Sequence, residues 1–175
     1  MKLALTDESW ILEALNPIEW RFLSELPHLA SGSDLPPQAR KRLKPDPIDP
    51  LQALESDESS FEEDWREFVE PDLDRLFAES RDRVVDDLAS ASRNAEAPLP
   101  ERIEIPNENS EHWFSVINQA RLLMNEAHGI ADASERFDPE VFGESEKGVE
   151  RILLLAQYEF YTAIQSILLE YRMEP

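Results

Sequence analysis

The sequence predicts a mainly α fold, in which four to five helices form one compact domain over residues 1–175, with a small N-terminal β-hairpin. Three observations support this prediction. Apolar residues recur at helical spacing over residues 113–127 and 146–173, and residues 2–6 alternate as a strand does. With 41% apolar residues in a chain of 175, there is enough apolar surface to bury a core.

The N-terminal segment predicts the hairpin. Polar residues at 7–9 favour a turn, and the apolar run from Trp10 to Leu12 provides a second strand. A helix over residues 8–15 is the rival interpretation. Residues 102–105 also alternate, and a third short strand there would pair with the hairpin to give a three-stranded sheet.

The next element is a helix that begins after Asn16. Asn16 suits the capping position, Pro17 suits the first helical position, and Glu19 completes a capping box. We expect the helix to end at Pro27, because proline cannot continue the backbone hydrogen-bond ladder.

Residues 30–60 predict a proline-rich loop or linker that is mobile or functional. Five prolines occur in this range, and proline at such density favours extended backbone. The segment also holds a basic cluster from Arg40 to Lys44. Two interpretations stay open for the cluster: contact with an acidic partner or nucleic acid, or a solvated linker that pairs with the acidic helices of the chain itself.

The region from Phe61 to about residue 93 predicts acidic amphipathic helices. Glu70-Pro71 marks a break or a fresh helix start. Most of the dense charges must face solvent. The apolar positions are Phe61, Trp65, Phe68 and Val69 before the break, and Leu73, Leu76, Phe77, Val84 and Leu88 after it.

A helix capped by Asn109 or Ser110 and ended by Gly129 follows. One stripe of this helix is apolar and predicts packing, with the members Trp113, Ile117, Ala120, Met124 and Ala127. The neighbouring stripe carries Asn118, Arg121 and Asn125, and it is the sharpest candidate binding site. An arginine offers five donors in a fork that suits a carboxylate or phosphate. The structural alternative is that Arg121 pairs with an acid of the helices at 61–93 and Asn118 closes a helix contact.

The last helix is expected over about residues 146–173 and is expected to be the central packing element. We also expect one turn of helix to start at Asp138-Pro139-Glu140, before Gly143. The apolar arc of the last helix is so wide that several neighbouring elements, or a second chain, must cover it. The candidate interface is Val149, Leu153, Phe160, Ile164, Ile167 and Tyr171, and a second apolar side carries Leu154, Tyr158, Tyr161 and Leu168.

The net charge limits which kinds of partner the chain is expected to bind. The chain has 38 acidic and 17 basic residues, for a net charge of −21. Such a charge opposes binding to nucleic acid and to anionic membranes, and it favours a basic protein partner. An acidic decoy that imitates nucleic acid is a third option. The polar start of the chain gives no secretory signal and charges interrupt the last helix, so we expect a cytoplasmic location and no membrane span.

Motifs for catalysis, cofactors or metals do not stand out. The chain has no cysteine, which excludes disulfides, thiolate zinc sites and cysteine nucleophiles. Glu25 and His28 have the Glu-x-x-His spacing of di-iron bundles, but those sites need a second such pair. We therefore expect no catalytic residue, no cofactor site and no metal site, and we expect the tryptophans Trp10, Trp20, Trp65 and Trp113 to be core residues.

Two blocks of sequence resemble a family. Residues 65–71 (Trp-Arg-Glu-Phe-Val-Glu-Pro) form the first block, and residues 117–122 (Ile-Asn-Gln-Ala-Arg-Leu) form the second. With the early Pro17-Ile18-Glu19 helix, they resemble a bacterial family of unknown function, best known from actinobacteria, with a Trp-containing acidic helix and an Asn-x-x-Arg-Leu helix. The resemblance implies a cytoplasmic regulator or accessory protein and brings no reaction. The glycine expected after Arg121 is absent, where the chain reads Leu122 to Asn125.

The expected function is a non-enzymatic accessory or regulatory protein that acts through protein–protein contacts, with a homodimer through the last helix. The alternative is a small-ligand binder or enzyme that uses Arg121 and Asn118 in a helical pocket.

Overall fold

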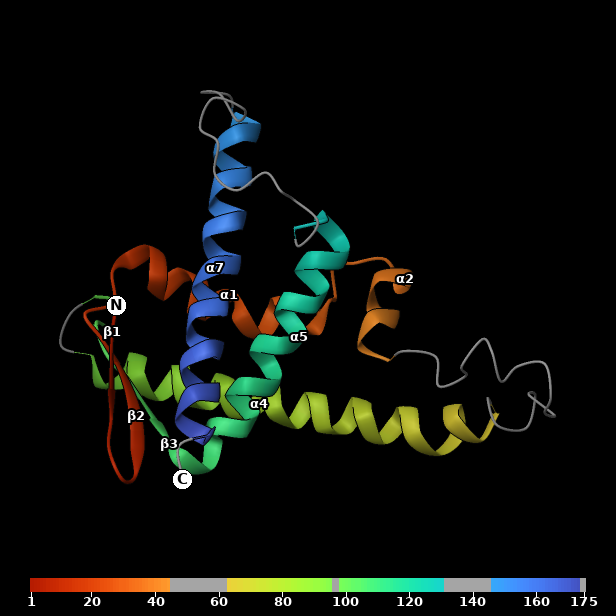
Figure 1. Ribbon diagram of the computed structural model, residues 1–175, viewed down its shortest axis with the longest axis horizontal. Helices are drawn as coiled ribbons and strands as arrows, with labels where there is room; N and C mark the ends of the chain where they lie inside the picture. The colour runs from red at the N-terminus through yellow and green to blue at the C-terminus, as the bar shows by residue number, and fades with distance from the viewer. Residues whose placement is uncertain (45–62, 96–97, 131–145, 174–175) are drawn as a thin grey trace.

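The computed structural model describes residues 1–44, 63–95, 98–130 and 146–173, and it confirms the mainly α fold (Figure 1). Within these ranges it has five α-helices and one three-stranded antiparallel sheet. The helices are α1 (Pro17–Ser31), α2 (Pro37–Arg40), α4 (Glu70–Asn94), α5 (Ser110–His128) and α7 (Glu146–Met173).

The sheet confirms the hairpin and the third strand. Strands β1 (Lys2–Leu5), β2 (Ser9–Glu13) and β3 (Ile103–Pro106) lie in the order β1-β2-β3. Leu3 pairs with Leu12, and Trp10 pairs with Ile105. The rival helix over residues 8–15 is wrong, because β2 is the central strand and its backbone is paired on both sides.

Helix α1 begins as predicted and ends four residues later than predicted. Asn16 Oδ1 accepts from the backbone N–H groups of Ile18 and Glu19, and Glu19 accepts from the N–H of Asn16. Pro27 lies inside the helix rather than at its end. Leu26 and Ala30, on either side of Pro27, are fully buried, and this packing offsets the lost hydrogen bond. Gly32 ends the helix with a φ of 60°.

The described part of the predicted loop is partly helical, which corrects that prediction for residues 37–43. Pro37 occupies the first position of the short helix α2, where its missing N–H carries no penalty. A 3₁₀ turn, η1 (Lys41–Leu43), follows. Lys44 Nζ then lies 2.6 Å from Asp74 Oδ2, as expected if the basic cluster pairs with the chain's own acidic helix. Residues 45–60 of the predicted loop are outside the described residues.

Helix α4 is continuous with a π-helical turn, η2 (Trp65–Val69). The N–H of Glu70 bonds to the carbonyl of Trp65, and Pro71 sits in the first turn of α4. Glu70-Pro71 therefore marks a change of helix type and not an interruption. Phe68 is 62% exposed, whereas Val84 and Leu88 are buried, so only the second half of the predicted stripe packs into the core.

Helix α5, and not α7, is the central packing element. It contacts α1, α4 and α7, and seven of its side chains are buried. Asn109 holds the N-cap position but its side chain forms no cap hydrogen bond; its Nδ2 donates to Asp87. Gly129 ends the helix with a φ of 60°, and its N–H bonds to the carbonyl of Asn125 at 2.7 Å.

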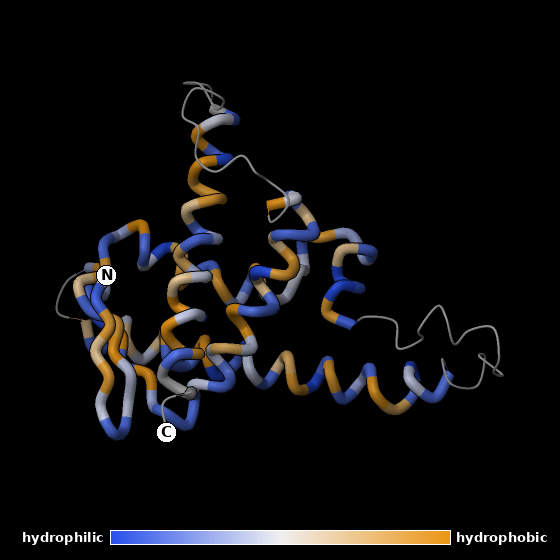
Figure 2. Tube along the Cα trace, viewed as in Figure 1, coloured by the Kyte–Doolittle hydropathy of each residue, from blue (hydrophilic) through white to orange (hydrophobic). Residues whose placement is uncertain are grey.

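Helix α7 spans Glu146–Met173, as predicted, while the predicted turn at 138–140 is outside the described residues. Figure 2 shows orange, apolar residues along its upper half, which extends past the other helices. Residues Lys147–Glu170 are long and apolar enough to cross a membrane, and 33% of that window is buried. A core helix meets the same criterion, so this finding carries no membrane assignment.

Candidate functional site

The polar stripe of α5 lies against α7. Arg121 donates from Nη1 to Gln165 Oε1 and from Nη2 to Tyr158 Oη, the latter at 3.3 Å. Its guanidinium carbon is 5.0 Å from the centroid of the Tyr158 ring. Gln165 Nε2 also donates to Asn118 Oδ1 at 3.5 Å. Asn118 and Arg121 thus both bond to Gln165 of α7. The backbone carbonyl of Asn125 accepts from the N–H of Gly129 at the end of α5.

Arg121 does not pair with an acid of residues 63–87, which corrects the structural alternative. Among the described residues its partners are a neutral amide and a phenol, and its Nε is buried without a hydrogen-bond partner. The other part of that alternative agrees with the structure, since Asn118 closes the contact between α5 and α7.

A second arginine is held in the same way on the opposite side of α5. Arg81 of α4 donates to Gln119 Oε1 at 3.1 Å, and Gln119 Nε2 donates to Ser115 Oγ at 3.0 Å. Gln119 is 2% exposed. Burial lowers the pKa of Arg81, and the fields of Asp82 and Asp74 partly offset this effect. No sequence pattern distinguishes Arg81 from the other charges of α4.

A carboxylate joins the start of α5 to α4. Asp87 accepts from Trp113 Nε1 at 2.8 Å and from Asn109 Nδ2 at 3.0 and 3.1 Å. Burial raises the pKa of Asp87, and the two hydrogen-bond donors oppose the rise. Trp113 also packs edge-to-face on Trp10, with ring centroids 5.6 Å apart. These contacts explain Asp87 as a structural residue.

The inner face of α7 carries a polar ladder formed by Gln157, Tyr161 and Gln165. Tyr161 Oη donates to the carbonyl of Phe22 at 2.6 Å, and Gln157 Nε2 donates to Glu25 at 3.0 Å. Burial raises the pKa of Tyr161, so its hydroxyl stays protonated. The ladder was missed in the sequence, although the spacing of four residues between its members was readable within an apolar helix.

The predicted interface residues divide between two faces. Val149 is 50% exposed and Leu153 is 38% exposed, while Phe160 and Ile167 are half-buried. Ile164 is buried and belongs to the core, because it lies on the same side of α7 as Tyr161 and Leu168. The side chain of Tyr171 is outside the described residues.

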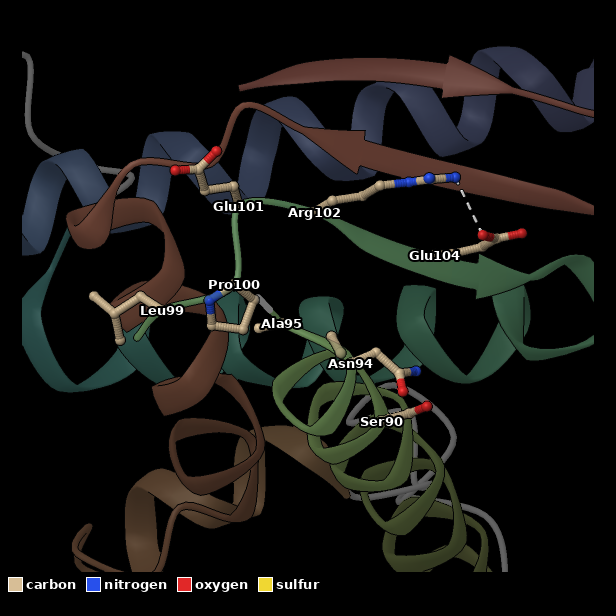
Figure 3. A pocket seen from close by; sticks show the side chains of 9 residues that line it. Ser90, Asn94, Ala95, Leu99, Pro100, Glu101, Arg102 and Glu104 are labelled. Atoms are coloured by element: carbon tan, nitrogen blue, oxygen red, sulfur yellow. Dashed lines mark hydrogen bonds and ion pairs between the residues drawn. The ribbon is translucent and has the colours of Figure 1, made fainter. Parts of the chain in front are cut away.

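Two hollows lie along α4. The first, of about 740 Å³, lies between the end of α4 and β3 (Figure 3). Ser90 and Asn94 line it from α4, and Arg102 and Glu104 line it from β3 and the residue before it, where they form an ion pair of 3.2 Å. The second, of about 540 Å³, lies between α1 and α4. Neither hollow includes Arg121 or Asn118.

Metal-ligating side chains are dispersed. Across the described residues there is no group of three His, Asp or Glu that could hold a metal ion. His28 Nε2 lies 2.6 Å from Asp34, and His112 Nδ1 lies 3.2 Å from Ser80 Oγ. Burial, with a smaller effect from Arg151, lowers the pKa of His128. His28 and His112 therefore have side-chain partners of their own, and His128 lies at the end of α5.

Fold and contacts together define a mainly helical, acidic domain in which Arg81, Asp87, Arg121 and Tyr161 join one helix to another. A family model described as a domain of unknown function, DUF2017, matches residues 6–171. The chain belongs to this family, which confirms the resemblance to a family of unknown function. No curated protein and no solved structure matches the chain.

Proposed function

We propose that this chain is a non-enzymatic accessory or regulatory protein that acts in the cytoplasm through protein–protein contacts. We further propose that it forms a homodimer through α7. A bacterial, actinobacterial-type origin, which the resemblance implies, is part of the same proposal.

One observation carries the proposal: an apolar seam on α7 that the other described residues do not cover fully. The seam has the spacing 4-3-4-3-4, which is the spacing of core positions in a coiled coil. Val149, Leu153 and Ala163 are exposed, and the positions between them are half-buried. The members of the seam are Val149, Leu153, Ala156, Phe160, Ala163 and Ile167.

The seam suits a second copy of the chain because an apolar stripe on one helix is complementary to itself. In a two-fold symmetric dimer each seam would pack against the other, which is the commonest arrangement of homodimers. The net charge of −21 adds repulsion between copies. We therefore expect the dimer to be strengthened by salt.

A second surface supports a basic protein partner. Phe68 and Leu76 are 62% and 49% exposed on the first part of η2 and α4, which Figure 1 shows extending beyond the helical bundle. Acidic residues surround them, including the exposed Glu67 and Asp74. A surface that combines exposed apolar side chains with negative charge favours a partner with a basic, partly apolar face.

The decisive experiment is the molar mass in solution, measured by light scattering during gel filtration at several concentrations. We expect about twice the chain mass of 20.2 kDa for the wild type. Leu153→Glu places a charge in the seam and should give a monomer. Leu169→Glu is the matched control, because Leu169 is 44% exposed on α7 but lies outside the seam. A wild-type monomer at high concentration contradicts the dimer.

The alternative function is a small-ligand binder or enzyme that uses Arg121 and Asn118. It is supported by the lack of a carboxylate partner for Arg121 among the described residues and by its buried, unbonded Nε. Titration with phosphate and with acetate, followed by NMR of arginine side chains, tests it. A ligand should shift the Arg121 signal in the wild type. An unchanged signal at saturating anion contradicts this alternative.

A further inference from the structure

The groove between α1 and α4 differs in charge from the rest of this acidic chain. Of its ten lining residues none is Asp or Glu, although the chain has 38 acids among 175 residues. Two lining residues, His28 and Arg81, are able to carry positive charge. The hollow between α4 and β3, in contrast, is lined by Glu101 and Glu104 beside Arg102.

Of the two residues able to carry positive charge, His28 has a carboxylate partner in Asp34, whereas Arg81 has none among the described residues. Arg81 bonds to the neutral amide of Gln119, and it forms no salt bridge with any of the described residues. Its guanidinium is partly buried, and Asp82 and Asp74 act on it through their fields without supplying a directly paired negative charge. An anion in the groove would supply that charge, and a guanidinium can hold a carboxylate with two parallel hydrogen bonds.

The remaining walls of the groove are mostly apolar or small. Trp20 and Pro27 line it from α1, and Val85, Leu88 and Ala89 line it from α4. Val85 is 47% exposed, so a bound apolar group would cover surface that water now contacts. The serine hydroxyls in the wall already donate to carbonyls of their own helices, as Ser24 does to Trp20.

We propose that the α1–α4 groove binds a small amphipathic anion, with its carboxylate on Arg81 and its apolar chain or ring against Val85 and Leu88. The volume of about 540 Å³ lies in the range of about 300–1,000 Å³ that is usual for small-molecule sites. The side chain of His28, held by Asp34 at 2.6 Å, borders the same groove and sets its polar edge. This inference is independent of the proposed homodimer, since the groove does not include α7.

The test uses octanoate as the probe and the uncharged octanamide as its matched comparison, with the full chain labelled for amide NMR. Octanoate should bind at least about tenfold more tightly than octanamide, because a charge-assisted hydrogen bond is worth that factor or more. The shifted amides should gather around Ser24, Arg81 and Ala89. Equal affinity for the two probes, or shifts that gather on α7, would overturn the proposal.

Two variants locate the charge that recognises the anion. Arg81→Gln should reduce the affinity for octanoate to about that for octanamide. Arg83→Gln is the control, because Arg83 is exposed on the same helix and does not line the groove, and it should leave both affinities unchanged. Equal weakening by both variants would show a general charge effect and would overturn the site. If Arg81→Gln does not fold, the wild-type comparison of the two probes still decides.

A macromolecular ligand is a distinct outcome of the same test. An acidic, apolar peptide that shifts the groove amides, together with the absence of any shift by octanoate, would overturn the small-ligand proposal in favour of a peptide site.

Discussion

Replacement of Asp87 by alanine tests the contacts that fix the start of α5 on α4. The carboxylate of Asp87 is the hydrogen-bond acceptor for Trp113 Nε1 and for Asn109 Nδ2. Trp113 is fully buried and Asp87 is half-buried, so removal of this acceptor takes away the hydrogen-bond partner of a buried indole N–H. The variant therefore leaves a buried donor unpaired where α4 meets the start of α5.

The magnitude follows from two opposing effects. An unpaired buried donor costs about 1–3 kcal/mol, and the lost hydrogen bonds to a charged group add to that cost. Removal of a partly buried carboxylate also removes the free-energy cost of its desolvation. That desolvation is the main cause of the raised pKa of Asp87. We expect a net loss of about 2–3 kcal/mol in the free energy of unfolding, or about 4–12 °C in Tm for a domain of this size.

The assay is urea unfolding followed by tryptophan fluorescence, with the midpoint and the m-value measured for each variant. Asp86→Ala is the matched control, because Asp86 is the exposed neighbour on the same helix, and it should change stability by less than about 0.5 kcal/mol. If Asp87→Ala costs no more than Asp86→Ala, the role given to these hydrogen bonds is refuted.

Three further predictions follow from the same structure. The pKa of Asp87 is raised in the native state, so the contribution of this carboxyl group to stability is present below the ordinary carboxyl pKa. That contribution is lost as the pH rises through the native pKa. Asp87→Asn should therefore gain stability relative to the wild type as the pH rises above about 4, which urea unfolding at several pH values would measure. Gly32→Ala should cost about 2–3 kcal/mol, because its φ is +60° and the new Cβ would lie 2.9 Å from Leu123, whereas Gly129→Ala, with the same φ and open space, should cost about 1 kcal/mol; equal melting shifts would contradict this. Tyr161→Phe should cost about 1–2 kcal/mol by thermal unfolding, since its hydroxyl bonds to a backbone carbonyl of α1 at 2.6 Å, and an unchanged Tm would count against the ladder.

The elements with strong local signals could be predicted from the sequence. The capping box at Asn16, the left-handed end at Gly129 and the bounds of α7 all depend on residues close in the chain, and the structure confirms them. The same local logic failed at Pro27, where burial of residues on both sides keeps α1 helical. Local rules state what a segment prefers, and tertiary packing decides when that preference is overridden.

The candidate site could be predicted only in part, because its partners are distant in the chain. The stripe that contains Asn118 and Arg121 was readable, but the partner Gln165 lies 44 residues after Arg121. Abundant acids made a carboxylate the expected partner, and the structure instead uses a buried amide. For the same reason Arg81 was not distinguishable from the other charges of α4, since its special feature is that it lines a groove between two helices whose lining residues include no acid.

The polar ladder of α7 explains why the apolar seam is left exposed. A helix that is apolar over a wide arc can rotate about its axis and bury either side, so packing alone does not decide which residues face outward. Gln157, Tyr161 and Gln165 each bond to α1 or α5, and together they select one rotation. In that rotation Val149 and Leu153 remain exposed. Substitutions in the seam should therefore change self-association with little effect on unfolding, whereas substitutions in the ladder should lower stability first and disturb association only through the loss of the fixed rotation.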